Sequence, residues 1–285
     1  MKISAATVLA SALLLVNLVW ADADEGERIA ALSAQVEQRP DDQDLRLQRA
    51  WAYLEFNQLD LALADVRAAE SLGDPRKVAY THGVLLVRQG DYTAARPYFD
   101  RYLQAYPEQW SALGYRARLL RDIGEEQAAL ADYEALIRLN DALNPGDYVA
   151  AARLMASVPG RGVDDALALL DRRIEQRGPV SSLQRYAIEL ETERGNYTAA
   201  IERMAELDQR LRATPQWQLD VAELLLLDTR SDEALSYIAV AQEQLAAGRK
   251  TAVNRALMDR AGRLREAALA PVPQGGGAPA PAAVQ

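Results

Sequence analysis

Residues 80–107 read YTHGVLLVRQGDYTAARPYFDRYLQAYP, and this stretch decides the fold. Apolar residues recur at intervals of three and four on both sides of Gly90, which predicts two helices joined by a tight turn. Gly83 in the first helix and Ala95 in the second are small enough for the two helices to approach closely. Phe99 follows Ala95 by one helical turn, where it can fill the groove between the helices.

This hairpin pattern recurs along the chain six times. An alanine marks the second helix of each unit, and successive alanines are 33, 34, 37, 34 and 34 residues apart. A turn residue stands five positions before each alanine. The alanines are Ala62, Ala95, Ala129, Ala166, Ala200 and Ala234. The turn residues are Asn57, Gly90, Gly124, Arg161, Gly195 and Thr229. A period of this length, kept in register, predicts a linear array of helical hairpins.

The unit resembles the tetratricopeptide repeat, a helix–turn–helix of about 34 residues. The match covers about residues 43–242. It is best in the second and third units, and one unit contains together the motif residues Gly83, Gly90, Tyr92, Ala95, Phe99 and Pro107. The fourth unit departs by three extra residues before Ala166, and the fifth has Glu191 where an apolar residue is usual. The resemblance implies an all-α, right-handed α-solenoid of about six repeats.

Stacking is what such hairpins need for stability. Two short helices cannot bury their apolar faces alone, and the next pair covers them. The two ends of the array need polar cover, which predicts a capping helix at each end. The expected organisation is a signal peptide at 1–21, an acidic leader and N-terminal capping helix at 22–42, six repeats at 43–248, a C-terminal capping helix at 249–270 and a disordered Pro/Gly/Ala tail at 271–285.

Residues 1–21 have the layout of a secretory signal. Lys2 gives the positive start, an apolar run follows, and Val19 and Ala21 form a small-x-small cleavage pattern. We therefore expect cleavage, export to a bacterial periplasm and no stable insertion into the membrane afterwards. The alternative is an inner-membrane anchor over residues 3–21, because a run of this length can barely span a bilayer.

The composition excludes several classes of function. The chain has no cysteine, which excludes zinc–thiolate and iron–sulfur sites, and one histidine, which excludes a site built from two imidazoles of one chain. The formal net charge of −9 argues against nucleic acid as the main partner. No residue pattern points to a metal site, a cofactor site or a catalytic centre, so we expect none.

Four pairs of neighbouring acidic residues are candidates for acid–base chemistry. The pairs are Asp41 with Asp42, Glu125 with Glu126, Asp164 with Asp165, and Asp232 with Glu233. They stand just before predicted helices, as do Asp60, Asp91 and Asn196. A side-chain oxygen there caps free backbone N–H groups, so we interpret these residues as helix caps. His82, the one histidine that a catalytic triad could use, is interpreted as structural or exposed.

The resemblance implies that the first helices of the repeats line an inner groove. The side chains expected there combine aromatic rings with cations, both of which are favoured anchors in interfaces. They are Trp51, Lys77, Tyr80, Arg88, Arg118, Arg121, Tyr148 and Arg185. We therefore predict a non-catalytic interaction scaffold of the cell envelope that binds an extended peptide or a helix of another envelope protein.

Two alternatives belong to other classes of function. One is a glycan-handling accessory protein in which Trp51, Tyr80 and Tyr148 stack on sugars. The other is an α/α hydrolase, which would need a deep pocket lined by carboxylates. An open trough would favour the peptide, a line of exposed rings the glycan, and a closed pocket with facing acids the hydrolase. The oligomeric state stays open.

Overall fold

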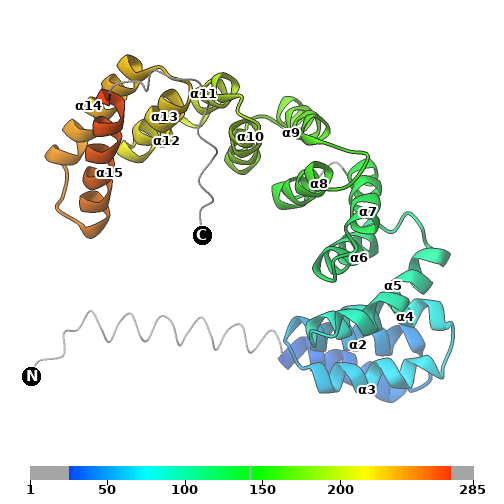
Figure 1. Cartoon of the computed structure of the whole chain (residues 1–285). Coiled ribbons are helices and arrows are strands. Elements are labelled where there is room, and N and C mark those ends of the chain that lie inside the picture. The colour runs from blue at the N-terminus through cyan, green and yellow to red at the C-terminus, as the bar shows by residue number, and fades with distance from the viewer. Residues whose placement is uncertain (1–25, 141–142, 271–285) are drawn as a thin grey trace, which may run out of the picture. The chain divides into compact units, whose positions relative to one another are not determined.

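The computed structural model describes residues 26–140 and 143–270, and every element of regular structure within these ranges is a helix (Figure 1). The prediction of an all-α fold is confirmed. The expected signal peptide and the expected C-terminal tail lie outside the described residues. The chain forms two compact units, and the boundary between them lies between Leu143 and Asn144.

The first unit contains a leading helix over residues 26–38 and three helical hairpins. The second helix of each of the first two hairpins packs against the first helix of the next hairpin. The first helices α2, α4 and α6 also contact one another in series. The elements are α2 (Gln43–Glu55), α3 (Leu59–Glu70), α4 (Pro75–Arg88), α5 (Tyr92–Ala105), α6 (Trp110–Asp122) and α7 (Glu126–Leu139). Within this unit, each apolar hairpin face is therefore covered by a neighbour along the chain.

The second unit continues the pattern with three more hairpins and a closing helix. In the closing helix α15, Ala261 is fully buried, and Leu257 and Leu264 pack against the same core. The elements are α8 (Pro145–Ser157), α9 (Val163–Arg177), α10 (Ser181–Glu193), α11 (Tyr197–Ala205), α12 (Gln209–Arg212), α13 (Pro215–Leu227), α14 (Ser231–Ala247) and α15 (Ala252–Leu269). α15 packs against both α13 and α14, so it covers the end of this unit.

Small residues at the repeat positions lie at the helix contacts. The residues with no exposed surface are Ala62, Ala95, Ala129, Ala166, Ala200 and Ala234. Gly83, also buried, faces Phe99: a Cβ added to this glycine would lie 3.1 Å from two ring carbons. Phe99 is fully buried and cannot move aside, so the close approach of α4 to α5 depends on the missing side chain of Gly83.

The turns inside the hairpins repeat one backbone geometry. In five of them, the residue five positions before the repeat alanine has a positive φ. The residue after it donates a backbone hydrogen bond to the carbonyl oxygen of the residue five positions earlier, as Asp91 does to Leu86 at 2.9 Å. These five are Asn57, Gly90, Gly124, Gly195 and Thr229. This left-handed cap ends a helix and satisfies its last carbonyl groups. In the fourth hairpin Arg161 lies in the turn as predicted, but the residue with the positive φ is its neighbour Gly160.

Two repeats depart from the regular pattern. Three residues separate the helices of the other hairpins, whereas five separate α8 from α9, which accounts for two of the three extra residues of the fourth repeat. The third extra residue lies in the connection before α8. In the fifth repeat the second helix is broken: α11 ends at Ala205, and a one-turn helix, α12, follows from Gln209.

Glu125 is the N-cap residue of α7 but makes no capping hydrogen bond, and Asp41 precedes the N-cap residue of α2. The other residues predicted to cap helices divide into two groups. Asp42, Asp91 and Asn196 are N-caps whose side chains accept a hydrogen bond from a backbone N–H, as predicted. Others occupy the first helical turn instead, so for them the capping prediction is wrong. This second group is Asp60, Glu126, Asp164, Asp165, Asp232 and Glu233. Their charges still lie at the positive end of the helix dipole.

Glu191, the unusual residue of the fifth repeat, is buried with its charge compensated. Arg194 donates to its carboxylate at 2.6 Å, and the Nε atom of Arg203 lies 3.6 Å from its other oxygen. Arg203 also forms a two-pronged ion pair with Asp171 at 2.6 and 2.8 Å. Paired charges can be buried where an unpaired one cannot, so this departure is accommodated without loss of the hairpin.

Candidate functional site

The first unit carries a continuous set of aromatic side chains, called the aromatic run, made of Trp51, Tyr80, Tyr102, Tyr106 and Tyr115. Ring centroids of Trp51 and Tyr80 are 5.4 Å apart, and Tyr102 stacks on Tyr80 at 5.1 Å. Tyr106 follows Tyr102 at 4.9 Å, and Tyr115 meets Tyr80 edge-on at 6.0 Å. Three successive hairpins therefore contribute rings that meet around Tyr80.

Tyr80 holds the run together and offers it one polar group. Its ring lies edge-on to the buried Phe99, and its hydroxyl is hydrogen-bonded to Ser111. Burial raises the pKa of Tyr80 above its usual value. Tyr80 and Tyr102 are half-buried, and Tyr106 is exposed. Such a surface offers ring faces and hydroxyl groups to a ligand.

The predicted groove cations of the first unit differ in their surroundings. Lys77 lies one turn before Tyr80 on α4 and is paired with Asp44 at 3.0 Å. Arg121 pairs with its neighbour Asp122 at 2.7 Å. Arg88 is exposed at the end of α4 and forms no ion pair within the described residues. Arg118, on α6, is half-buried.

The two predicted groove residues of the second unit differ in exposure. Tyr148 is only 4% exposed, and the guanidinium of Arg173 lies over its ring at 5.3 Å. The prediction that Tyr148 faces a groove is therefore wrong, and the glycan alternative loses one of its three rings. Arg185, by contrast, is exposed and lines a pocket.

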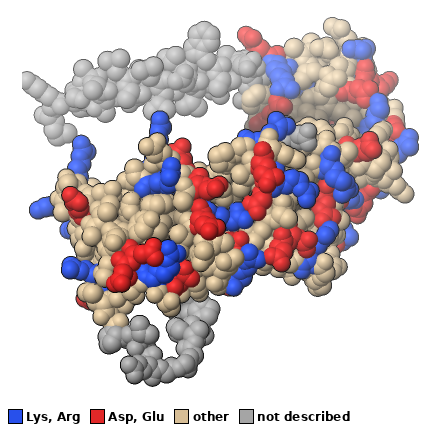
Figure 2. Space-filling model, turned by 90° about the horizontal axis from the view of Figure 1, so that it is seen from above, with Lys and Arg blue, Asp and Glu red and all other residues tan. Residues whose placement is uncertain are grey.

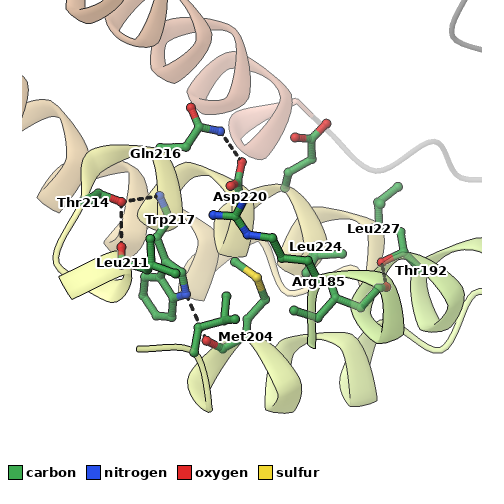
Figure 3. A pocket seen from close by; sticks show the side chains of 13 residues that line it. Arg185, Thr192, Met204, Leu211, Thr214, Gln216, Trp217, Asp220, Leu224 and Leu227 are labelled. Atoms are coloured by element: carbon green, nitrogen blue, oxygen red, sulfur yellow. Dashed lines mark hydrogen bonds between the residues drawn. The ribbon is translucent and has the colours of Figure 1, made fainter. Parts of the chain in front are cut away.

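This pocket has a volume of about 530 Å³ and is lined by residues of α10, α11, α12 and α13 (Figure 3). Its lining is largely apolar and includes Ile188, Met204, Leu207, Leu211, Trp217, Leu224 and Leu227. The indole Nε1 of Trp217 donates to the carbonyl oxygen of Met204 at 3.0 Å, which fixes the ring against α11. Asp220 and Glu223 also line the pocket and are both bonded to Arg260 of α15.

Several residues of these surfaces were missed by sequence reasoning. Tyr102 and Tyr106 belong to the second helix of a hairpin or follow it, and the resemblance directs attention only to first helices. Their spacing of four residues after Tyr98 is a signal that could have found them. The lining of the pocket, apart from Arg185, gave no comparable signal.

No described feature of the chain indicates catalysis or a metal site. The ring of His82 lies against that of Tyr98, tilted by 37° with centroids 4.1 Å apart, and its Nδ1 lies 2.9 Å from a carboxylate oxygen of Glu70. Within residues 26–140 and 143–270 there is no cluster of three or more metal-ligating side chains. Among the helices in those ranges, none is long and apolar enough to cross a membrane. Basic and acidic side chains are interspersed on the face seen in Figure 2.

Comparison with known proteins identifies the repeat. A family model described as tetratricopeptide repeat matches residues 80–148. The chain has the fold of tetratricopeptide repeat proteins. The C-terminal part of a TPR repeat-containing protein from Cytophaga hutchinsonii is similar in structure, with a TM-score of 0.62 at 11% identity, covering 86% of this chain and 97% of that one.

A structure of Naa15/Naa10 bound to HypK-THB also shares the fold. It has a TM-score of 0.55 at 15% identity and covers 91% of this chain and 38% of that one. Identities this low establish the fold alone. No curated protein shows significant sequence similarity to this chain. Tetratricopeptide repeats are typically non-enzymatic scaffolds for protein–protein interaction, which agrees with the broad class predicted from the sequence.

Proposed function

We propose that this chain is a non-catalytic scaffold that binds an extended peptide or a partner helix on the aromatic run. The observation that carries this proposal is the contiguity of Trp51, Tyr80 and Tyr102, whose partly exposed rings come from successive hairpins. Single exposed apolar residues are ordinary on a protein surface, whereas a contiguous patch marks an interaction site. Aromatic rings also supply a large contact area at a low cost in side-chain entropy.

The proposed partner is another protein or peptide of the bacterial cell envelope. Support for this compartment comes from the sequence of residues 1–21, which has the order of charge, apolar run and small residues that a secretory signal requires. The absence of cysteine is compatible with folding in an oxidising compartment, since no disulfide has to form.

Photo-crosslinking in envelope extract tests the proposal. A photoreactive phenylalanine derivative replaces Tyr106 in one variant and Tyr92 in another, because these tyrosines of the first unit are almost equally exposed, at 37% and 36%. We expect a discrete crosslinked polypeptide from position 106, at least fivefold above the yield from position 92. We also expect N-terminal sequencing of the recovered chain to begin at Asp22.

Two outcomes contradict the proposal. Equal crosslinking from both positions would mean that the aromatic run has no special role. Retention of the wild-type chain on envelope polysaccharide, lost with Tyr106→Ala and retained with Tyr92→Ala, would instead establish the glycan alternative.

A further inference from the structure

The pocket belongs to the second unit, and residues 271–285 continue the chain from α15 of that same unit. We propose that residues 278–284, APAPAAV, occupy this pocket in their own chain, so that the protein covers its own apolar surface. The inference concerns a contact within the second unit and goes beyond the scaffold function proposed for the aromatic run.

The pocket offers a preformed apolar surface to such an occupant. Met204, Leu207 and Leu224 line it and are themselves buried, so its floor is already shaped. Leu227, also in the lining, remains 48% exposed, and burying its side chain would be favourable. The half-buried ring of Trp217 is held in place by its bond to the carbonyl oxygen of Met204 (Figure 3).

The charges of the lining favour an occupant without charge. Arg185 is a cation of the lining, whereas Asp220 and Glu223 are two carboxylates. Arg260 of α15 pairs with both carboxylates, at 2.7 Å in the case of Asp220. An ionised group of either sign would therefore meet a like charge as well as an opposite one, and it would also lose its hydration. Residues 271–285 contain no charged side chain.

The segment is long enough to return to the pocket from the end of α15. Arg260 reaches the pocket wall through its two ion pairs, and it stands ten residues before Ala270. Ten residues of a helix span about 15 Å. The connecting residues 271–277, PVPQGGG, cover about 23 Å when extended. Their three glycines also let the chain reverse its direction, because glycine adopts φ of either sign.

The composition and the tether of the segment make this contact inexpensive in entropy. Pro279 and Pro281 have a fixed φ before they bind, and the alanines have no rotamers to lose. The proline rings and Val284 supply the apolar surface that meets Trp217 and Leu227. Because the segment is joined to α15 by a short connection, its effective concentration at the pocket is on the order of 1 mM. A contact of low intrinsic affinity is therefore still populated.

A spin label on the segment tests the contact in the full chain. The chain has no cysteine, so Ala282→Cys allows a nitroxide to be attached at one position only. We expect the label to broaden the NMR signal of the Trp217 indole N–H and to remove most of its intensity. Chemical reduction of the nitroxide should restore the signal.

Matched variants of the pocket and of the segment provide the controls. Leu227→Ala should lower the equilibrium constant of the contact about fivefold, whereas Val240→Ala, at a 42% exposed aliphatic residue of α14, should leave it unchanged. In the segment, Pro279→Asp combined with Pro281→Asp should abolish the broadening. Pro271→Asp combined with Pro273→Asp adds the same charge to the connecting residues and should preserve most of it.

Three results would overturn the inference. The first is a Trp217 signal that the label leaves unbroadened, and the second is an equal effect of Leu227→Ala and Val240→Ala. The third is broadening in a mixture of spin-labelled chains with isotope-labelled chains that carry no spin label, because the occupant would then be a second copy. None of these results affects crosslinking from position 106, so the inference and the proposed function can fail separately.

Discussion

A left-handed turn residue occupies the same place in five of the six hairpins, and in one of them it is a threonine. Thr229 has a φ of 60°, and its equivalent in the third hairpin is Gly124, with a φ of 82°. Glycine adopts this conformation without strain, whereas a β-branched residue does not. The helix cap is therefore formed at Thr229 in spite of the side chain.

Replacing this threonine should stabilise the second unit. The strain at such a residue costs about 1–3 kcal/mol, and the greater freedom of glycine in the unfolded chain offsets about 0.5–1 kcal/mol of it. We expect Thr229→Gly to raise the free energy of unfolding by about 1 kcal/mol in urea titrations. Gly124→Thr should lower it by a similar amount, and a stabilising Gly124→Thr would contradict this explanation.

Single residues also explain why part of the binding surface escaped prediction. The place of Tyr148 in its repeat predicts that it faces the groove, but it lies in α8, the first helix after the extra connecting residue, and is buried beneath Arg173. Trp51 and Tyr80 were identified because their repeats keep the regular spacing. Position within a repeat predicts exposure only where the register is intact.

At the scale of the helices, an ion pair recurs between the two members of a hairpin. Arg49 of α2 binds Asp65 of α3 through two bonds of 2.7 Å, and Arg116 of α6 binds Asp132 of α7 in the same way. Each pair spans 16 residues, and in the hairpin between them His82 and Tyr98 occupy the equivalent places and are in ring contact. The same pair of repeat positions thus joins the two helices by an ion pair in two hairpins and by a ring contact in the hairpin between them.

The packing of α4 on α5 gives a test at this scale. Gly83→Ala would force a methyl group against the ring of Phe99, and overpacking of this kind costs about 1–3 kcal/mol. Gly262→Ala is the matched control, because a Cβ added at Gly262 has no atom within 4 Å. Since this variant replaces a helical glycine, its free energy of unfolding should rise by up to about 1 kcal/mol. Thermal unfolding should separate the variants, and equal midpoints would show that α4 and α5 do not pack this closely.

The hairpins could be predicted from the sequence because alanine spacing and turn residues both depend on local geometry. The break between α11 and α12 could not. Leu207 and Leu211 keep a spacing of four residues through it, so the apolar period continues although the helix does not. Leu207 and Leu211 also line the pocket, which the sequence therefore does not predict either. Of the aromatic run, the sequence predicts Trp51 and Tyr80 only. Tyr102 lies on the second helix α5, Tyr106 follows that helix, and Tyr115 lies on the first helix α6 but carries no distinguishing signal in the repeat pattern.

At the scale of the whole molecule, stability depends on neighbours in sequence. Both compact units consist of three consecutive hairpins, and the core of the second includes Met204, Leu219, Ile238 and Ala261 from successive elements. In such an array the free energy of unfolding is close to a sum of repeat and nearest-neighbour contributions. A binding site can therefore be altered in one unit without loss of the other.

Circular dichroism of fragments of different length tests most directly whether a hairpin depends on its neighbours. Helices of this length are marginal in water without tertiary packing. We predict that residues 75–107, one hairpin, remain largely unfolded, whereas residues 26–140, with the leading helix and three hairpins, show strong helicity and a cooperative thermal transition. Full helicity of the single hairpin, or an unfolded 26–140 fragment, would contradict the account.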